Sequence, residues 1–292
     1  MHIDSLIYFY KVAKNGNISS VAKESHISQS ALSQQIQKLE NNLNVKLLNR
    51  NNKGVTLTHE GEILYKYSET IINSYEKMQE ELYSSQNEKK LAYIESIESL
   101  SLNILPSVLF KLKNKFTNYN ISLVSNEDSS QNLINNLADI SLSYKKESKE
   151  INIISKLIGY DNLVLVGNSS FQDITIKKED LKTLPLILLS DKTYLDEVIY
   201  KPLDLSSNYI DSINLLYTTN SYVSCIYGVL SSNALTFVPL NVYKTFENSN
   251  LKLINTEDFN LSLPIFINYS EKYYKTNSEV IKYFKNTLKG YL

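Results

Sequence analysis

The spacing of apolar residues between Asn17 and Leu39 predicts two short amphipathic helices joined by a tight turn. Ile18, Val21 and Ala22 would form the apolar face of the first helix. Ser28 is positioned to cap the second helix. The apolar face of that second helix would consist of Ala31, Leu32, Ile36 and Leu39.

The outward face of the second helix carries neutral hydrogen-bonding side chains and one cation: Gln29, Ser30, Ser33, Gln34, Gln37 and Lys38. A helix that is merely solvated more often carries Glu and Lys. Ser and Gln offer both donor and acceptor groups, which suits contact with base edges in a major groove. A surface helix without a binding role is the alternative, and these residues alone leave both open.

The segment from Leu6 to Gly61 resembles the winged helix-turn-helix of LysR-type transcriptional regulators. The motifs that carry the resemblance are S-Q-S-A-L-S-Q-Q-I-Q-K-L-E from Ser28, L-N-V-K-L-L-N-R from Leu43 and L-T-H-E-G from Leu57. The family usually has Pro where this chain has Ser30, and Gly where it has Asn44. Neither departure is damaging, because Pro is optional in a first helical turn and Asn tolerates a left-handed backbone.

The net charge of −1 hides an asymmetry along the chain. Residues 1–58 hold seven basic and three acidic groups, whereas the rest holds 23 basic and 28 acidic groups. Phosphate binding by the N-terminal part alone would require such a distribution. We expect double-stranded DNA as the partner, at operator half-sites, with contacts from Ser28, Gln29, Ser30, Ser33, Gln34, Gln37, Lys38, Arg50 and Lys53.

Arg50 is the only arginine of the protein and precedes the turn N-N-K-G, which predicts a short hairpin, the wing. Its planar fork suits bidentate contact with phosphate or a groove edge. A surface salt bridge to a nearby carboxylate is the alternative role for Arg50.

Thr58 is positioned to cap a long helix from about His59 to about Gln86. Apolar residues recur along it in a heptad pattern with one polar position at Ser68. In the resembling family this linker helix pairs antiparallel with that of a second subunit, which implies a homodimer or homotetramer that reads two half-sites. A helix packed on its own domain is the alternative. The expected dimerisation residues are Leu64, Ile71, Tyr75, Met78 and Leu82.

After a polar break at residues 84–90 the pattern changes to alternating strands and helices. Strands are predicted at 91–94, 121–124, 139–143, 151–157, 163–166, 184–189, 214–217, 235–239, 251–254 and 264–269. Helices are predicted at 101–116, 130–137, 221–231 and 279–288. Such alternation implies parallel sheets with helices on both faces.

Weaker similarity to the family's effector-binding domain continues through L-A-D-I-S-L from Leu137 and N-L-V-L-V-G from Asn162. It implies two α/β lobes like those of periplasmic binding proteins. The predicted fold is therefore α/β, with a winged helix-turn-helix at 1–58, a linker and dimerisation helix at 59–88 and an effector-binding domain at 89–292. Lobe I would take 89–161 and 265–292, and lobe II 162–264.

A small-molecule pocket would then lie between the lobes, at the carboxyl ends of the strands. The hydroxyl side chains expected in this pocket lie at helix starts, where they could instead serve only as helix caps. No arginine follows Arg50, so a bidentate guanidinium clamp on a ligand is excluded. Glu95 and Glu98 add acidic groups, which tilts the expectation toward a ligand with a cationic or amino group, although a solvated acidic rim is the simpler explanation. The expected effector-binding residues are Ser96, Ser99, Glu127, Asp128, Ser129, Tyr144, Thr219, Asn220 and Ser221.

Signatures of an enzyme are missing from the sequence. All three histidines, His2, His26 and His59, lie in the first 60 residues, which leaves the large domain without an imidazole base. There is no C-x-x-C, H-E-x-x-H, P-loop or serine nucleophile pentad. We therefore expect no catalytic residue, cofactor or metal. A carboxylate-only hydrolase stays possible without any support.

The remaining features fit a cytoplasmic regulator. Cys225 is the only cysteine, so an internal disulfide is excluded and a buried thiol is expected. No apolar run has the length of a membrane span, and no signal peptide is evident. The missing signal peptide and the basic N-terminal part argue against a stand-alone solute-binding protein. The sequence thus predicts a ligand-responsive transcription factor of the LysR type.

Overall fold

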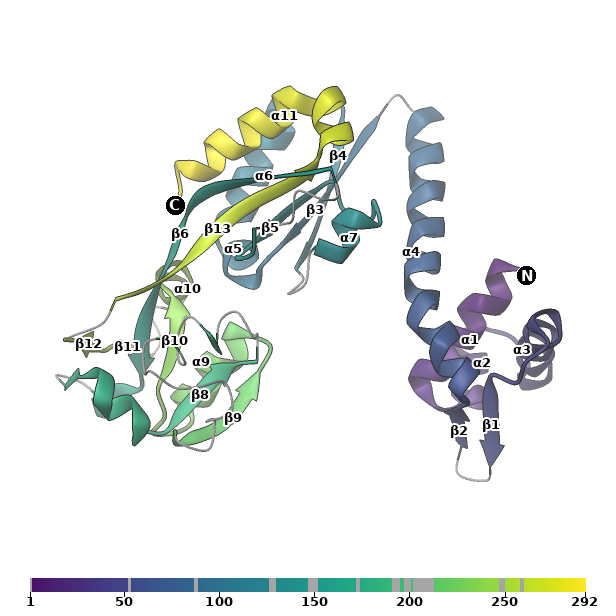
Figure 1. Ribbon diagram of the computed structural model, residues 1–292, viewed down its shortest axis with the longest axis horizontal. Coiled ribbons are helices and arrows are strands. Elements are labelled where there is room, and N and C mark those ends of the chain that lie inside the picture. Colours follow the sequence, from purple (N-terminus) through teal and green to yellow (C-terminus); the bar gives the residue numbers. More distant parts are fainter. Residues whose placement is uncertain are drawn as a thin grey trace. The chain divides into compact units, whose positions relative to one another are not determined.

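The computed structural model of the protein describes residues 2–51, 54–86, 89–125, 130–146, 152–171, 174–190, 195–196, 201, 213–246, 250–257 and 260–292 (Figure 1). The chain divides into two compact units, Met1–Asn87 and Glu88–Leu292. The first unit has one main hydrophobic core and the second unit has two.

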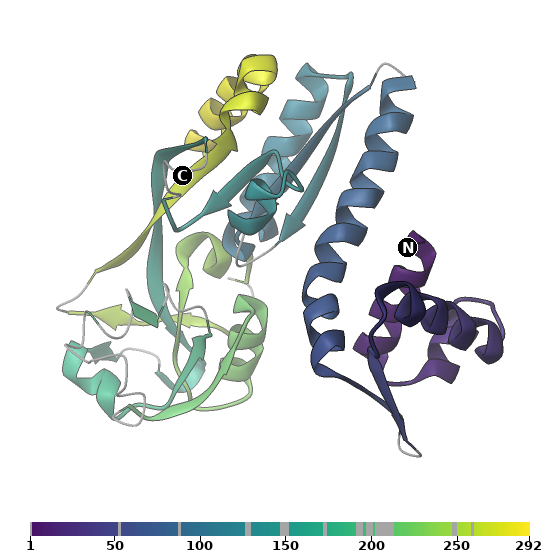
Figure 2. The same cartoon turned by 45° about the vertical axis from the view of Figure 1, so that its right-hand side comes forward.

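The first unit is helical with one hairpin, and Figure 2 shows its short helices gathered at one end of the long helix. Its core is formed by residues such as Leu6, Phe9 and Ile36, all fully buried. Its elements are α1 (Ile3–Asn15), α2 (Ile18–Glu24), α3 (Gln29–Leu43), β1 (Leu48–Asn51), β2 (Gly54–Leu57) and α4 (His59–Gln86).

Gly16 fixes the hairpin to the helices. It ends α1 with a φ of 65°, a left-handed conformation that glycine adopts without a Cβ penalty. Its N–H donates to the carbonyl of Val12 at 2.8 Å, and its own carbonyl accepts from the N–H of Val55 at 3.0 Å. One residue therefore both ends α1 and holds β2.

The second unit is α/β and two-lobed. One hydrophobic core includes Ile94, Leu105 and Phe284, and the other includes Leu188 and Phe237. The elements around the first core are β3 (Lys90–Ser96), α5 (Glu98–Leu102), α6 (Ile104–Lys115), β4 (Tyr119–Ser125), α7 (Ser130–Ile134), β5 (Ile140–Ser143) and α11 (Glu271–Lys289).

Two long strands, β6 (Ile153–Gly167) and β13 (Leu261–Ser270), run side by side from one core to the other (Figure 1). Ile158 of β6 belongs to the first core, whereas Leu163 belongs to the second. The main sheet has the strand order β10-β6-β13-β5-β3-β4, and β11 also pairs with β6. The remaining elements are η2 (Ser169–Phe171), β7 (Thr175–Ile176), η3 (Lys178–Lys182), β8 (Leu186–Leu189), β9 (Leu215–Thr219), α9 (Tyr222–Leu230), β10 (Thr236–Pro239), α10 (Leu240–Thr245), β11 (Lys252–Leu253) and β12 (Asn255–Thr256).

The α/β class was predicted correctly, but the expectation of parallel sheets is wrong for part of the main sheet. β3 is parallel to β4 and β5, whereas β13 runs antiparallel to β5 and β6, and β10 antiparallel to β6. The predicted strands at 151–157 and 163–166 are one strand of 15 residues. Polar residues such as Lys156 and Asp161 interrupt the apolar run there, but they do not interrupt the pairing with β13.

Three predicted helices have different bounds. The helix at 101–116 is two helices separated at Asn103, and Pro106 lies in the first turn of α6, where its missing N–H costs nothing. The helix at 130–137 ends at Ile134, shortly before Asn136 turns left-handed at φ 57°. The closing helix begins at Glu271, because the Ser270 hydroxyl caps it by accepting from the N–H of Tyr273 at 3.1 Å.

Candidate functional site

Side-chain caps define the two helices that were expected between Asn17 and Leu39. The amide oxygen of Asn17 accepts from the N–H of Ser20 at 3.0 Å and so begins α2. The Ser28 hydroxyl accepts from the N–H of Ala31 at 3.1 Å and begins α3. Between them His26 is left-handed, with a φ of 55°, which produces the tight turn. Both helices and the Ser28 cap are confirmed.

The face of α3 that points inward is fixed by packing. Leu32, Ile36 and Leu39 are fully buried. Gln35 is turned toward α1, where its amide oxygen accepts from the Ser5 hydroxyl at 3.0 Å. The rotation of α3 about its own axis is therefore set by contacts within the unit.

The opposite face of α3 forms two adjacent rows, since residues four apart lie one above the other on a helix. Ser33 is half-buried, and Ser28 and the other outward residues are exposed. Gln29 already accepts from the Ser19 hydroxyl at 3.0 Å, and the hydroxyls of Ser28 and Ser30 lie 3.0 Å apart. The rows consist of Gln29, Ser33 and Gln37, and of Ser30, Gln34 and Lys38. We call these six residues and Ser28 the reading face.

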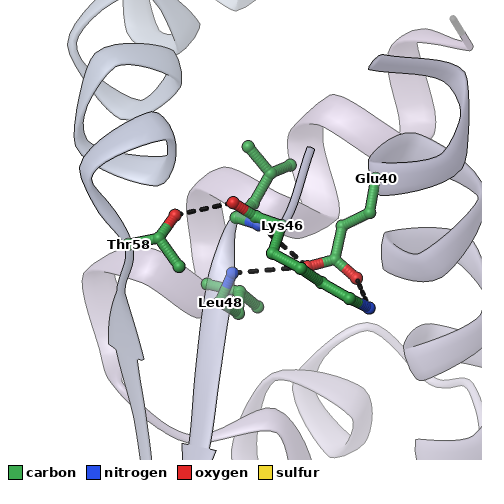
Figure 3. A network of polar contacts seen from close by, with 5 residues as sticks. Glu40, Lys46, Leu48 and Thr58 are labelled. Atoms are coloured by element: carbon green, nitrogen blue, oxygen red, sulfur yellow. Dashed lines mark hydrogen bonds and ion pairs between the residues drawn. The ribbon is translucent and has the colours of Figure 1, made fainter. Parts of the chain in front are cut away.

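A buried carboxylate ties α3 to the hairpin (Figure 3). Glu40 is 5% exposed, and its Oε1 accepts from the N–H groups of Leu47 at 2.9 Å and Leu48 at 3.4 Å. Its Oε2 accepts from Lys46 Nζ at 3.2 Å. Burial raises the pKa of Glu40, but these hydrogen bonds and the Lys46 charge outweigh it, so the pKa is lowered overall. Glu40 is thus held as a carboxylate.

The residues between α3 and β1 also hold the start of α4. The Thr58 hydroxyl donates to the carbonyl of Lys46 at 2.7 Å and accepts from the N–H of Gly61 at 3.0 Å, so Thr58 caps α4 as predicted. A Cβ at Gly61 would collide with the Leu47 carbonyl, which makes glycine necessary there. The reading face, the hairpin and α4 therefore share one set of contacts.

The predicted wing is an antiparallel hairpin in which Arg50 of β1 lies opposite Val55 of β2. The structure describes Arg50 by its backbone, and Lys53 lies outside the described residues. Asn44 ends α3 with a φ of 54°, so asparagine does take the left-handed position that the sequence analysis assigned to it.

The residues of the expected dimerisation seam on α4 differ in exposure. Ile71, Met78 and Leu82 are 39%, 46% and 59% exposed. Leu64 is half-buried because it packs on the core of the first unit, and Tyr75 is half-buried and its hydroxyl lies 3.2 Å from the Gln79 amide. The N-terminal part of α4 thus packs on its own unit, while Ile71, Met78 and Leu82 are exposed.

The residues predicted to bind an effector are only partly brought together. Ser96 is fully buried and donates to the backbone carbonyl of Ile97 at 3.2 Å. Ser99 lies 3.0 Å from the hydroxyl of Tyr144. Ser221 caps α9 and contacts Glu98 rather than Ser99 or Tyr144. Thr219 is half-buried and Asn220 exposed, and Glu127, Asp128 and Ser129 lie outside the described residues.

Asp161 lies at the centre of this region and was not among the predicted site residues. Asp161 is 1% exposed, and its Oδ2 accepts from the Tyr144 hydroxyl at 2.7 Å. Tyr144 packs against both hydrophobic cores of the second unit. The available signal was a lone carboxylate between the predicted strands at 151–157 and 163–166, in a segment to which no strand was assigned. We call Glu98, Ser99, Tyr144, Asp161 and Ser221 the interlobe cluster.

The part of the chain that the structure describes has neither a membrane-spanning helix nor a metal-binding cluster. No helix there is long and apolar enough to cross a membrane. No three His, Cys, Asp or Glu residues in the same part are grouped so that they could hold a metal ion. Cys225 is fully buried, as expected, and burial raises the pKa of its thiol to about 11.

Comparison with known proteins gives this arrangement a family. The sequence profile described as "Bacterial regulatory helix-turn-helix protein, lysR family" matches residues 3–62. The chain is 29% identical over 195 residues to the HTH-type transcriptional regulator SoxR of Arthrobacter sp. (strain TE1826), a match of 64% of this chain and 63% of that protein. Residues 3–62 therefore belong to the helix-turn-helix family of LysR-type regulators.

Other relatives match over more of the chain than SoxR does. A probable RuBisCO transcriptional regulator of Phaeodactylum tricornutum is 25% identical over 289 residues, which are 95% of this chain and 93% of that protein. The match to SoxR, by contrast, spans less than two thirds of its length. The proteins that these comparisons name are regulators and not enzymes, in agreement with the sequence analysis.

A solved structure supports the fold over the whole length of the chain. Full-length CbnR, crystallised with its target DNA, superposes with a TM-score of 0.72 over 99% of both chains at 19% identity. At that identity the likeness establishes the arrangement of helices and strands. It does not assign the DNA or any ligand to this chain.

Proposed function

We propose that this LysR-type chain is a sequence-specific DNA-binding transcriptional regulator in the cytoplasm, whose binding is modulated by a small-molecule effector. The observation that carries the proposal is the reading face of α3. It presents exposed uncharged donors and acceptors, together with Lys38, on a helix whose orientation is fixed by buried contacts. Such side chains can pair with base edges once the helix enters a major groove.

The electrostatics of the first part of the chain support the same proposal. Residues 1–58 carry a formal charge of +4. Glu40 is neutralised locally by Lys46 and backbone N–H groups, so it offers little repulsion to phosphate. We assign Arg50 and Lys53 of the hairpin region to phosphate or the groove edge.

We further propose that α4 forms a homodimer or homotetramer. The exposed side chains of Ile71, Met78 and Leu82 supply apolar area that a second copy of α4 would cover. A dimer would present two reading faces to two half-sites related by a twofold axis. We assign residues 1–58 to DNA binding, 59–88 to dimerisation and 89–292 to the effector domain.

Effector control would act as a population shift between arrangements of the lobes. We place lobe I at 89–161 and 265–292 and lobe II at 162–264, because the two hydrophobic cores divide within β6 and β13. The interlobe cluster lies where these two parts meet. A ligand with different affinities for the open and closed lobes would change the spacing of the paired DNA-binding domains, and with it the bend imposed on DNA.

The full-length protein can be tested by selection from a pool of random DNA duplexes, followed by titration of the enriched sequence. We expect an enriched sequence made of two related half-sites, bound about a thousandfold or more tightly than unselected duplex at the same salt. The Asn73→Ala variant is a suitable control, because Asn73 is an exposed amide of α4, away from the reading face and outside the heptad seam. Failure to enrich any sequence, with equal affinity for all duplexes, would refute sequence-specific recognition.

A further inference from the structure

Asp161 is a buried carboxylate without a full set of partners. Its Oδ2 accepts from Tyr144, but its Oδ1 is buried and accepts no hydrogen bond. Among the described residues no Lys, Arg or His forms an ion pair with it. Burial raises the pKa of Asp161, and the nearby hydroxyls of Ser99 and Tyr144 only partly oppose this. A buried acceptor left in this state costs free energy and calls for an explanation.

The hydrogen bonds of Ser99 and Tyr144 leave Oδ1 of Asp161 without a donor. Tyr144 has one hydroxyl proton, and it is given to Asp161. In the 3.0 Å contact between Ser99 and Tyr144 the donor must therefore be Ser99. The protons of Ser99 and Tyr144 are thus used within the cluster, the buried hydroxyl of Tyr222 also contacts Tyr144, and Oδ1 of Asp161 is left without a donor. The group that would complete this cluster is a donor.

The N-terminus of α9, where an anionic ligand group would bind, is already occupied by Glu98. Glu98 accepts through Oε1 from the Ser221 hydroxyl at 2.7 Å and through Oε2 from the N–H of Tyr222 at 2.6 Å. These groups form the N-terminus of α9, which would otherwise attract a ligand carboxylate. No arginine follows Arg50 in the sequence that could bind one elsewhere. A carboxylate ligand would have to displace Glu98.

Asp161 lies between the two cores, so ligand binding to it would be coupled to the arrangement of the lobes. Along β6 it lies between Ile158 of the first core and Leu163 of the second. Its partner Tyr144 packs against both cores. Because Asp161 is 1% exposed, a ligand can reach it only if the residues that cover it move, and the proposed shift between lobe arrangements would supply that movement.

We infer that the effector is a small compound with a protonated nitrogen, an amine or guanidine, whose N–H groups donate to Oδ1 of Asp161. This inference rests on the proposed effector control and adds the chemical class of the ligand. The positive charge would pair with Asp161, while Glu98 adds negative potential without giving up its contacts with α9. Charge-assisted hydrogen bonds to a buried carboxylate are the strong kind.

The test uses the full-length protein, thermal unfolding and a panel of probes: methylamine, putrescine, agmatine and arginine, with acetate, succinate and benzoate as carboxylates. We expect at least one amine or guanidine to raise the Tm in a saturable way, by about 5 °C at a hundredfold excess over its Kd. The Asp161→Asn variant should bind that probe about 10- to 100-fold more weakly. Glu179→Gln, which removes an exposed carboxylate of the same unit, should bind it as the wild type does.

The outcomes separate clearly. Stabilisation by carboxylates alone, by no amine or guanidine, or to the same extent in Asp161→Asn would overturn the inference. The wild-type panel decides the ligand class even if Asp161→Asn folds poorly. DNA selection on the same samples is independent: enriched half-sites without amine binding would leave the proposed regulator and reject the ligand class. Amine binding that requires Asp161, without any enriched DNA, would support the site and reject the regulator.

Discussion

The carboxylate of Glu98 accepts a hydrogen bond from the hydroxyl of Ser221 at 2.7 Å and so joins the two cores of the second unit. Glu98 begins α5, whose Leu100 belongs to the first core. Ser221 caps α9, whose Ile226 belongs to the second core. A charged acceptor on one lobe therefore closes the N-terminus of a helix on the other, where the helix dipole favours it.

Replacing Glu98 with Gln keeps the shape and removes the charge, so we expect the first turn of α9 to open more easily. Hydrogen exchange of the peptide that contains Tyr222 should become about tenfold faster, since about 1.4 kcal/mol of a charge-assisted contact is lost. Exchange in α3 should not change. An unaltered rate at α9 would show that Glu98 does not hold this helix.

The Glu40→Gln variant tests the contact between α3 and the hairpin. The amide of Gln carries no charge to pair with Lys46, and its oxygen accepts more weakly than a carboxylate from the N–H groups of Leu47 and Leu48. The free energy of unfolding should therefore fall by about 1–3 kcal/mol at pH 7. Urea titrations measure this loss. Glu24→Gln is the control, because Glu24 is exposed and its ion pair with Lys11 is 4.0 Å long.

The loss of stability in Glu40→Gln should become smaller as the pH falls. The pKa of Glu40 is lower in the folded protein than the value of 4.5 expected in the unfolded chain. The stabilisation by the carboxylate is therefore fully present above that value, and it is lost as pH falls through the folded pKa. The difference between wild type and Glu40→Gln should shrink in acid. A difference that grows in acid would contradict the assignment.

The sequence predicted the first unit well because its signals are local. Caps at Ser28 and Thr58 and the apolar period of α3 each act within a few residues, and the structure has them where they were expected. Asn44 could be assigned a left-handed backbone for the same reason. The exposure of the reading face followed directly from the helical period.

The second unit was predicted less well because its organisation depends on distant pairing. β6 pairs with β13, which follows about a hundred residues later, and nothing local shows that the two are antiparallel or that β6 is continuous. For the same reason Asp161 was missed: its meaning comes from Tyr144 and Ser99, which are close only in the fold. Chemistry at a local cap is visible in sequence, whereas chemistry assembled across a sheet is not.

The exposed part of α4 predicts a dimer contact that a charge should break. Ile71→Glu would place a carboxylate in the proposed interface at a cost of several kcal/mol, so sedimentation should show smaller species and operator binding should weaken. Asn73→Glu introduces the same charge at an exposed position of α4 outside the heptad seam and should have no such effect. A fully oligomeric Ile71→Glu variant would mean that α4 is not the principal dimer contact.

The hairpin can be tested through salt dependence. Each phosphate contact releases counterions, so Lys53→Ala should lower the slope of log affinity against log salt by about one unit, nearly independently of sequence. Arg50→Lys keeps the charge but removes the planar fork and so tests geometry separately. An unchanged slope in Lys53→Ala, together with full affinity in Arg50→Lys, would leave the hairpin without a part in recognition.

Gln34 is the residue at which base reading by α3 can be tested. Gln34 is exposed in the middle of the reading face, and its amide can donate and accept. The decisive measurement is the affinity of the full-length Gln34→Ala variant for the selected operator and for random duplex at one salt concentration. We predict a loss of about 1–3 kcal/mol on the operator and little change on random duplex. Equal losses on both, or none on the operator, would contradict base reading by this face.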